Sequence, residues 1–130
     1  MIRLASTYEV GLISLIEIAE EENISVKFLE NIVSAIKTKN LIQVKRCAKG
    51  GYYLSKAPSK INLTEVFEAL EADIINNEWL KSEAHSLTDV VVQTCLKELD
   101  GQIRGFLENK TLEDLLREFE KLKPGQMFYI

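Results

Sequence analysis

The first forty residues contain two stretches in which apolar residues recur every three or four positions, the spacing of an amphipathic helix. The first stretch predicts one helix over residues 5–22, starting near Ser6 or Thr7. The second predicts a helix over residues 24–40 with Ser25 as its N-terminal cap. The positions expected to face the core are Leu12, Leu15, Ile16 and Ala19 in the first helix, and Leu29, Ile32, Val33 and Ile36 in the second.

Between residues 41 and 55 the pattern changes to an alternation of apolar and polar residues, which is the period of a β-strand. Two short strands there flank the sequence AKGG and predict a β-hairpin, in which Gly50 and Gly51 provide the positive φ angles of a tight turn. Arg46 and Lys49 make the tip of this hairpin cationic. A cationic hairpin after two helices is typical of a wing, a segment usually pressed against nucleic acid.

Three further helices are predicted in the second half of the chain. A short helix begins near Asn62 or Thr64, a long helix covers residues 86–109, and a last helix begins at Thr111. Within the long helix, apolar residues recur at spacings of four and three, which defines a heptad seam suited to pairing with a second copy of the chain. The heptad seam consists of Val92, Leu96, Leu99, Ile103 and Phe106.

The formal net charge of -4 conceals an uneven distribution of charge. Residues 27–60 contain eight Lys or Arg and one acid, Glu30, a net charge of +7. The other residues contain eight Lys or Arg and nineteen acids, a net charge of -11. A basic block in an acidic chain indicates a local binding surface for a polyanion, although a solvated surface would have the same composition.

Helical geometry places a polar and cationic stripe on the second helix, opposite its apolar positions. Such side chains could reach base edges and phosphates in a DNA major groove. The alternative, an ordinary exposed face, becomes less attractive because the cationic hairpin follows directly. The stripe consists of Lys27, Asn31, Ser34 and Thr38, flanked by Glu30 and Lys37.

The two cysteines, Cys47 and Cys95, fit neither a disulfide framework nor a C-x-x-C metal site. Cys47 lies between Arg46 and Lys49, and neighbouring cations favour a thiolate that is open to oxidation. The alternative is that Cys47 is an unreactive thiol. Cys95 is expected to be a buried apolar thiol, and His85 a loop histidine.

Several classes of protein are not expected. The sequence contains no nucleotide-binding loop, no Ser-His-Asp arrangement and no zinc-ligand spacing, so an enzyme is not expected. No apolar run approaches the roughly 20 residues that span a bilayer, and no signal peptide is visible. A reducing cytoplasm is therefore the expected location, with no membrane partner.

The stretch RCAKGGYYLSKAPSKINLTEVFEALE resembles the wing and following helix of the Rrf-two family of bacterial winged-helix transcription regulators. The family wing reads approximately R-G-x-x-G-G-Y-x-L, and here Cys47 replaces the usual glycine. The segment ISVKFLENI is similar to the opening of the family's recognition helix, with Phe28 in place of tyrosine and Asn31 in place of glutamine. EVGLISLIEIA resembles the family's first helix, and GFLENKTLEDLL the end of its dimerisation helix. The matching wing residues are Arg46, Gly50, Gly51, Tyr52 and Leu54.

The resemblance implies a mostly helical fold with one small β-hairpin. A winged helix-turn-helix domain would cover residues 1–71, a loop 72–86, and a dimerisation helix with a C-terminal helix 87–130. It also implies a homodimeric cytoplasmic regulator that acts as a repressor, binds double-stranded DNA at a palindromic operator and pairs through the heptad seam. The residues expected to contact DNA are Ser25, Lys27, Phe28, Glu30, Asn31, Ser34, Arg46, Lys49, Gly50, Gly51 and Tyr52.

The sequence departs from the family pattern in two ways. The support helix of the helix-turn-helix is expected between Glu22 and Asn23, where there is no room for it, so it is either lost or missing from this sequence. Cluster-binding members carry three cysteines just before or at the start of the long helix, and this chain has none there. No metal and no [2Fe–2S] cluster is therefore expected.

Two alternative functions remain open at this point. One is a redox, iron–sulfur or metal-sensing regulator that uses Cys95, His85 or Cys47. The other is a winged-helix protein-interaction module that does not bind DNA.

Overall fold

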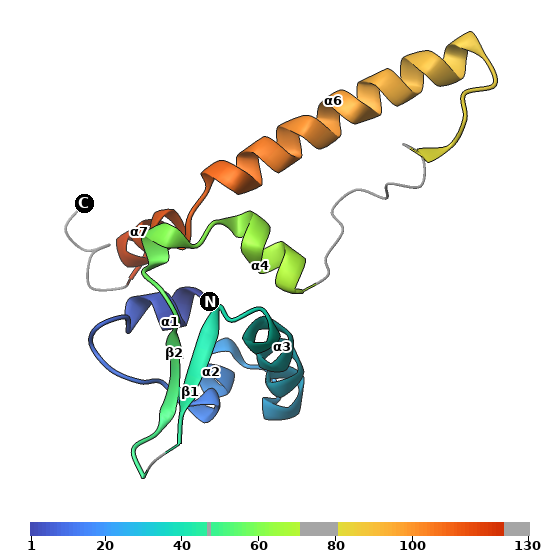
Figure 1. Ribbon diagram of the computed structural model, residues 1–130. Helices are drawn as coiled ribbons and strands as arrows, with labels where there is room; N and C mark the ends of the chain where they lie inside the picture. The colour runs from blue at the N-terminus through green and yellow to red at the C-terminus, as the bar shows by residue number, and fades with distance from the viewer. Residues whose placement is uncertain (47, 71–80, 124–130) are drawn as a thin grey trace.

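The computed structural model describes residues 1–46, 48–70 and 81–123 (Figure 1). The expected fold class, mostly helical with one small antiparallel hairpin, is confirmed. Figure 1 shows that helix α6 extends away from the other elements and that α7 returns beside α1. The described elements are α1 (Ile2–Ser6), α2 (Leu15–Glu22), α3 (Val26–Thr38), β1 (Ile42–Lys45), β2 (Gly51–Leu54), the 3-10 turn η1 (Pro58–Lys60), α4 (Leu63–Ala69), α6 (Leu87–Asn109) and α7 (Leu112–Lys121).

The single helix expected over residues 5–22 is wrong, because α1 ends at Ser6 and α2 begins at Leu15. Ser14 caps α2, since its Oγ accepts a hydrogen bond from the backbone N–H of Glu17 (3.2 Å). Between the two helices, Glu9 has a φ of 66°. This left-handed value is incompatible with a continuous right-handed α-helix. Ser6 therefore ends a helix instead of starting one.

The support helix that seemed to be missing is α2 itself. Asn23 ends α2 with a left-handed φ of 53°, and the backbone N–H of Ile24 donates to the carbonyl oxygen of Ala19 (3.0 Å). The chain then reaches Ser25, which caps α3, so α2 and α3 form a complete helix-turn-helix. The expectation that a helix was absent between Glu22 and Asn23 was wrong because α1 and α2 had been combined.

The hairpin pairs β1 with β2, with Ile42 opposite Leu54 and Lys45 opposite Gly51. The segment before α2 adds an isolated antiparallel bridge to the hairpin, because Ile13 and Tyr52 exchange backbone hydrogen bonds of 3.2 and 2.8 Å. Among the described residues no glycine has a positive φ, so the expected role of the glycines is wrong. Gly51 is needed because a Cβ there would lie 2.8 Å from the carbonyl oxygen of Ile13.

One hydrophobic core joins the N-terminal helices, the hairpin and the start of α7. Leu29, Val33 and Ile36 are buried as expected, whereas Ile16, also expected inside, is 60% exposed. Leu112 at the start of α7 is buried, and its backbone N–H donates to the carbonyl oxygen of Ile61 (2.9 Å). The core consists of Leu4, Ala5, Ile13, Ala19, Leu29, Val33, Ile36, Leu41, Ile42, Leu54, Ile61, Ala69 and Leu112.

Helices α4, α6 and α7 begin at the predicted caps. Asn62 and Glu65 form a capping box at α4, and Thr111 and Asp114 form another at α7. Ser86 caps α6 by accepting from the backbone N–H of Asp89 (3.1 Å). None of these described helices is both long and apolar enough to cross a lipid bilayer.

Candidate nucleic-acid interface

The first part of the candidate interface is the N-terminal half of α3. Ser25 Oγ accepts a hydrogen bond from the backbone N–H of Phe28 (3.1 Å), which fixes the start of the helix. On the opposite side, Leu29 and Val33 are buried in the core and set the rotation of the helix about its axis. The predicted DNA-contacting residues on α3 are all exposed: Ser25, Lys27, Phe28, Glu30, Asn31 and Ser34.

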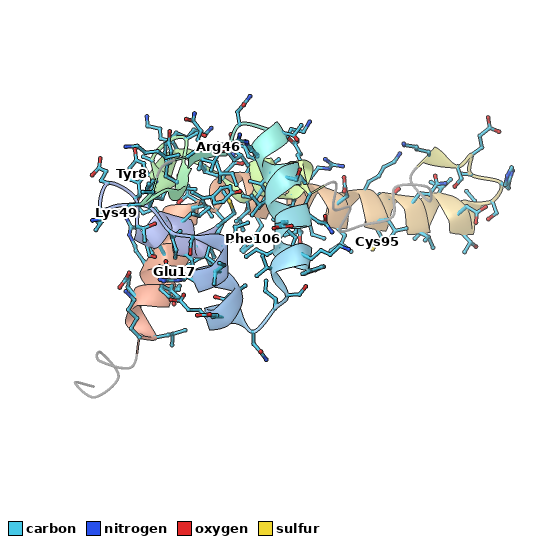
Figure 2. All side chains as sticks on the ribbon, turned by 90° about the horizontal axis from the view of Figure 1, so that it is seen from below. Tyr8, Glu17, Arg46, Lys49, Cys95 and Phe106 are labelled. Atoms are coloured by element: carbon cyan, nitrogen blue, oxygen red, sulfur yellow. The ribbon has the colours of Figure 1, made fainter. Side chains whose placement is uncertain are left out.

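The second part is the wing, whose predicted residues divide into two roles. Arg46 and Lys49 are exposed towards the hairpin tip, and Figure 2 labels both. Gly51 is buried and Tyr52 is half-buried, and both lie against the backbone of Ile13. Gly50 is half-buried, and Cys47 lies outside the described residues. The cations are therefore placed to contact a ligand, whereas Gly51 and Tyr52 hold the hairpin on the domain.

Most cations of the basic block lie on α3 and the hairpin. In Figure 1, α3 and the hairpin lie on the side of the domain that faces away from α6. The exposed cations include Lys27 and Lys37 on α3, and Lys39, which caps the C-terminal end of α3. Six of the eight cations of residues 27–60 thus lie on α3, its C-terminal end and the hairpin, whereas Lys56 pairs with Glu65 of α4 and Lys60 belongs to η1.

A cavity beside the wing was missed by the sequence reasoning. It has a volume of about 680 Å³ and lies between the α1–α2 segment and the outer part of the hairpin. The hydroxyl of Tyr53 on its wall donates to Oε1 of Gln43 (2.8 Å). No local pattern predicts this cavity, because its walls come from residues 8–12 and from the hairpin, which are far apart in the sequence. The cavity is lined by Tyr8, Glu9, Gly11, Leu12, Val44, Lys45, Tyr53, Leu54 and Ser55.

The heptad seam lies on α6, all of whose residues are described and none of which is buried. Val92, Leu99 and Phe106 are 44%, 47% and 59% exposed, and Leu96 and Ile103 are half-buried. The Nζ of Lys110 lies 5.6 Å from the centre of the Phe106 ring, a cation–π distance. The first turns of α6 also expose Leu87, Val90 and Val91, an apolar group that the heptad analysis missed because it tracks only one face.

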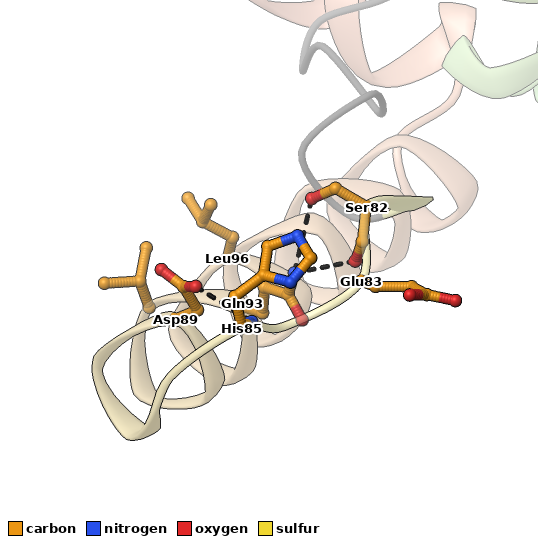
Figure 3. Close-up of a pocket in the computed structure, with 7 residues that line it drawn as sticks. Ser82, Glu83, His85, Asp89, Gln93 and Leu96 are labelled. Atoms are coloured by element: carbon orange, nitrogen blue, oxygen red, sulfur yellow. Dashed lines mark hydrogen bonds between the residues drawn. The ribbon is translucent and has the colours of Figure 1, made fainter.

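The loop before α6 forms a second cavity, of about 500 Å³ (Figure 3). The side-chain amide of Gln93 donates to the carbonyl oxygen of Ser82 (2.8 Å), and the backbone N–H of His85 donates to Oδ2 of Asp89 (3.0 Å). These bonds tie the loop to the first turns of α6. The residues lining this cavity are Ser82, Glu83, His85, Asp89, Val92, Gln93 and Leu96.

The residues considered for redox or metal chemistry are not brought together. Cys95 is exposed, which corrects the expectation of a buried thiol, and it is not among the described residues that line the cavity with His85. The described ranges contain no group of three or more His, Cys, Asp or Glu side chains arranged to hold a metal ion. A [2Fe–2S] cluster needs four ligands, and the chain has only two cysteines, so these residues do not fit a cysteine-ligated cluster.

A model of the Rrf2 family, described as "Iron-dependent Transcriptional regulator", matches residues 1–118. The chain belongs to the Rrf2 family. It is similar to the HTH-type transcriptional regulator CymR of Bacillus subtilis, with 31% identity over 130 residues that cover 100% of this chain and 91% of CymR. It is also similar to the HTH-type transcriptional regulator IscR of Escherichia coli, with 28% identity over 123 residues that cover 94% of this chain and 76% of IscR.

The solved structure of B. subtilis CymR, titled as the global cysteine regulator, has the same fold. It aligns with a TM-score of 0.79 and 30% sequence identity over 90% of this chain and 87% of CymR. The recognised resemblance is thus confirmed, and this Rrf2 protein is a transcriptional regulator and not an enzyme.

Proposed function

We propose that this Rrf2 protein is a homodimeric repressor that binds a palindromic DNA operator. The observation that carries the proposal is the arrangement of α3: its apolar face is buried, its N-terminus is capped, and its polar and cationic face is exposed beside a cationic wing. In a helix-turn-helix, the second helix enters the major groove and its N-terminal residues contact base edges. The N-terminal half of α3 and its cap carry three such polar or cationic side chains, those of Ser25, Lys27 and Asn31.

The wing supplies contacts that do not depend on sequence. Arg46 and Lys49 are exposed cations on a hairpin held against the domain by the Ile13–Tyr52 pairing. Cations of this kind bind phosphates or enter the minor groove, and they position the protein without selecting a base pair. α3 would therefore supply specificity, while the wing would supply affinity. Because it acts on DNA, the protein would work in the bacterial cytoplasm.

The heptad seam supports the homodimer. All residues of α6 are described, and none of them is buried within its own chain. A second helix that covered the apolar seam would therefore stabilise α6. Pairing through α6 relates the two DNA-binding domains by twofold symmetry, and a twofold-symmetric protein matches a palindrome. In this division of labour, residues 1–71 would bind DNA, 72–86 would connect, and 87–130 would dimerise.

We further propose that regulation does not use a conventional cysteine-ligated cluster. The family description names iron, but Cys47 and Cys95 are the only thiols and do not complete a ligand set. Anaerobically purified protein is expected to lack visible absorbance, iron and acid-labile sulfide. Stoichiometric iron and sulfide that are lost in Cys95→Ser would establish the metal-sensing alternative instead.

Fluorescence anisotropy on a duplex enriched from a randomised library tests the central proposal. The expected result is tight binding to the enriched duplex, weak binding to a scrambled duplex, and a steep loss of affinity as salt increases. Light scattering should give the mass of two chains. A protein that binds neither duplex at low salt would instead be the protein-interaction module.

A further inference from the structure

Phe28 stands out on α3 because it is large, apolar and 57% exposed. A phenyl ring has no hydrogen-bonding group, so it gains no direct contact with phosphate oxygens and is poorly solvated by water. Of the two side chains one turn further along the helix, Asn31 is polar and exposed, whereas Ile32 is half-buried and packs against the core. Phe28 is therefore the most exposed large apolar side chain on α3, ahead of Val26 at 37%.

The structure holds Phe28 in this exposed position. Its backbone N–H is bonded to Ser25 Oγ, and the next residue, Leu29, is 7% exposed in the core. Successive residues on a helix are about 100° apart, so a rotation that buried Phe28 would withdraw Leu29 from the core. The ring thus remains on the first turn of α3, the turn that lies closest to the base edges in a helix-turn-helix.

The chemistry of the major groove limits what such a ring can recognise. Base edges there present hydrogen-bond donors, hydrogen-bond acceptors and a single apolar group, the C5 methyl of thymine. We infer that Phe28 selects thymine in each half-site by packing its ring against that methyl group. This inference rests on the proposed function, because it requires α3 to lie in the major groove.

Uracil tests the inference directly, because it pairs with adenine as thymine does and lacks only the C5 methyl. The full chain is used to enrich a duplex from a randomised library, and each thymine of that duplex is then replaced by uracil in turn. Burying one methyl group contributes about 0.8 kcal/mol, which corresponds to about fourfold in affinity. One thymine per half-site should show this loss, and replacing both symmetric copies should weaken binding about fifteenfold.

Variants assign the methyl contact to Phe28. Phe28→Ala keeps the backbone bond to Ser25, and it should bind the thymine and uracil duplexes equally, at the weaker affinity. Phe28→Leu, which keeps an apolar side chain, should retain part of the preference for thymine. Leu122→Ala is the matched control, since Leu122 is 67% exposed but follows α7, and this variant should keep the full preference.

The outcomes separate the inference from the function on which it rests. Equal binding of thymine and uracil at every position would overturn the role of Phe28 while leaving DNA binding intact. A thymine preference that survives in Phe28→Ala would assign the methyl contact to another residue and also overturn it. If the library yields no enriched duplex, the proposed function and the role of Phe28 are both wrong.

Discussion

Within the winged-helix domain, Ile42, Leu54 and Ile61 are 1%, 2% and 0% exposed, whereas every residue of α6, the longest described helix, keeps some contact with solvent. A hydrophobic core stabilises the domain, and this core includes Leu112 at the start of α7. Helix α6 contacts α4, but most of its length extends alone (Figure 1). The domain is thus complete within one chain, whereas we expect a second chain to complete α6.

In the proposed dimer, this difference would couple the folding of α6 to association. Tertiary packing of an apolar face supplies most of the stability of helices in proteins, and α6 also contains Gly101 and Gly105, each of which costs about 1 kcal/mol in a helix interior. A partner along the heptad seam would supply the missing packing. We therefore expect substitutions in the domain to change stability at any protein concentration, and substitutions in the seam to act through the dimer.

The largest effect is expected for Leu99→Asp at the centre of the heptad seam. Each dimer would contain two uncompensated buried charges, each costing several kcal/mol, so light scattering should report monomers. The domain should keep its fold, because Leu99 is 47% exposed within its own chain. Thr94→Asp adds the same charge about 160° away from the seam centre and should remain dimeric. A dimeric Leu99→Asp of unchanged stability would show that the seam packs within one chain.

The next effect compares the same substitution in the two regions. In Gly51→Ala the new Cβ would lie 2.8 Å from the carbonyl oxygen of Ile13, so the wing must shift and the protein should lose about 1–3 kcal/mol of unfolding free energy. In Gly101→Ala the new Cβ meets nothing within 4 Å, and the gain in helix propensity should stabilise the protein by about 1 kcal/mol. Denaturant titrations measure the unfolding free energy of both variants. A destabilised Gly101→Ala would mean that the partner's backbone passes close to α6.

Local patterns in the sequence predicted much of this fold. Ser25, Asn62, Ser86 and Thr111 were recognisable as helix caps, because a cap depends only on residues within one turn. The hairpin was predicted for the same reason, since strand alternation and turn residues are adjacent in the chain. The exposed face of α3 then followed from helical periodicity alone.

The features that the sequence did not predict depend on distant contacts. The break between α1 and α2 is stabilised by the pairing of Ile13 with Tyr52, which are far apart in the chain. The need for glycine at position 51 arises from that same pairing rather than from the turn. The two cavities are formed by segments that meet only in the folded state. The DNA contacts and the dimer remain predictions.

A smaller effect is expected from the cations of the wing. Each phosphate contact contributes about 0.9 to the slope of log affinity against log salt, and a dimer carries each residue twice. Lys49→Ala and Arg46→Ala should therefore each flatten the slope by about 2 on specific and scrambled duplexes alike. Lys60→Ala removes the same charge from η1, which packs against α7, and should leave the slope unchanged. An unchanged slope in the Arg46, Lys49 double variant would show that the wing does not contact DNA.

The smallest effect concerns Asp114, at the junction where the chain leaves α6 and rejoins the core. The hydrogen bond from the Thr111 backbone N–H, followed by that with the Thr111 side chain, holds the pKa of the Asp114 carboxyl below its usual range. Because the folded pKa lies below the unfolded one, the carboxylate stabilises the folded state fully above the unfolded pKa, about 3.9. That contribution is lost as the pH falls from there through the folded pKa. Asp114→Asn should therefore melt below the wild type at pH 7, and the two melting temperatures should converge on acidification. A gap for Asp114→Asn that stayed constant with pH would assign the loss to the cap geometry and not to the charge.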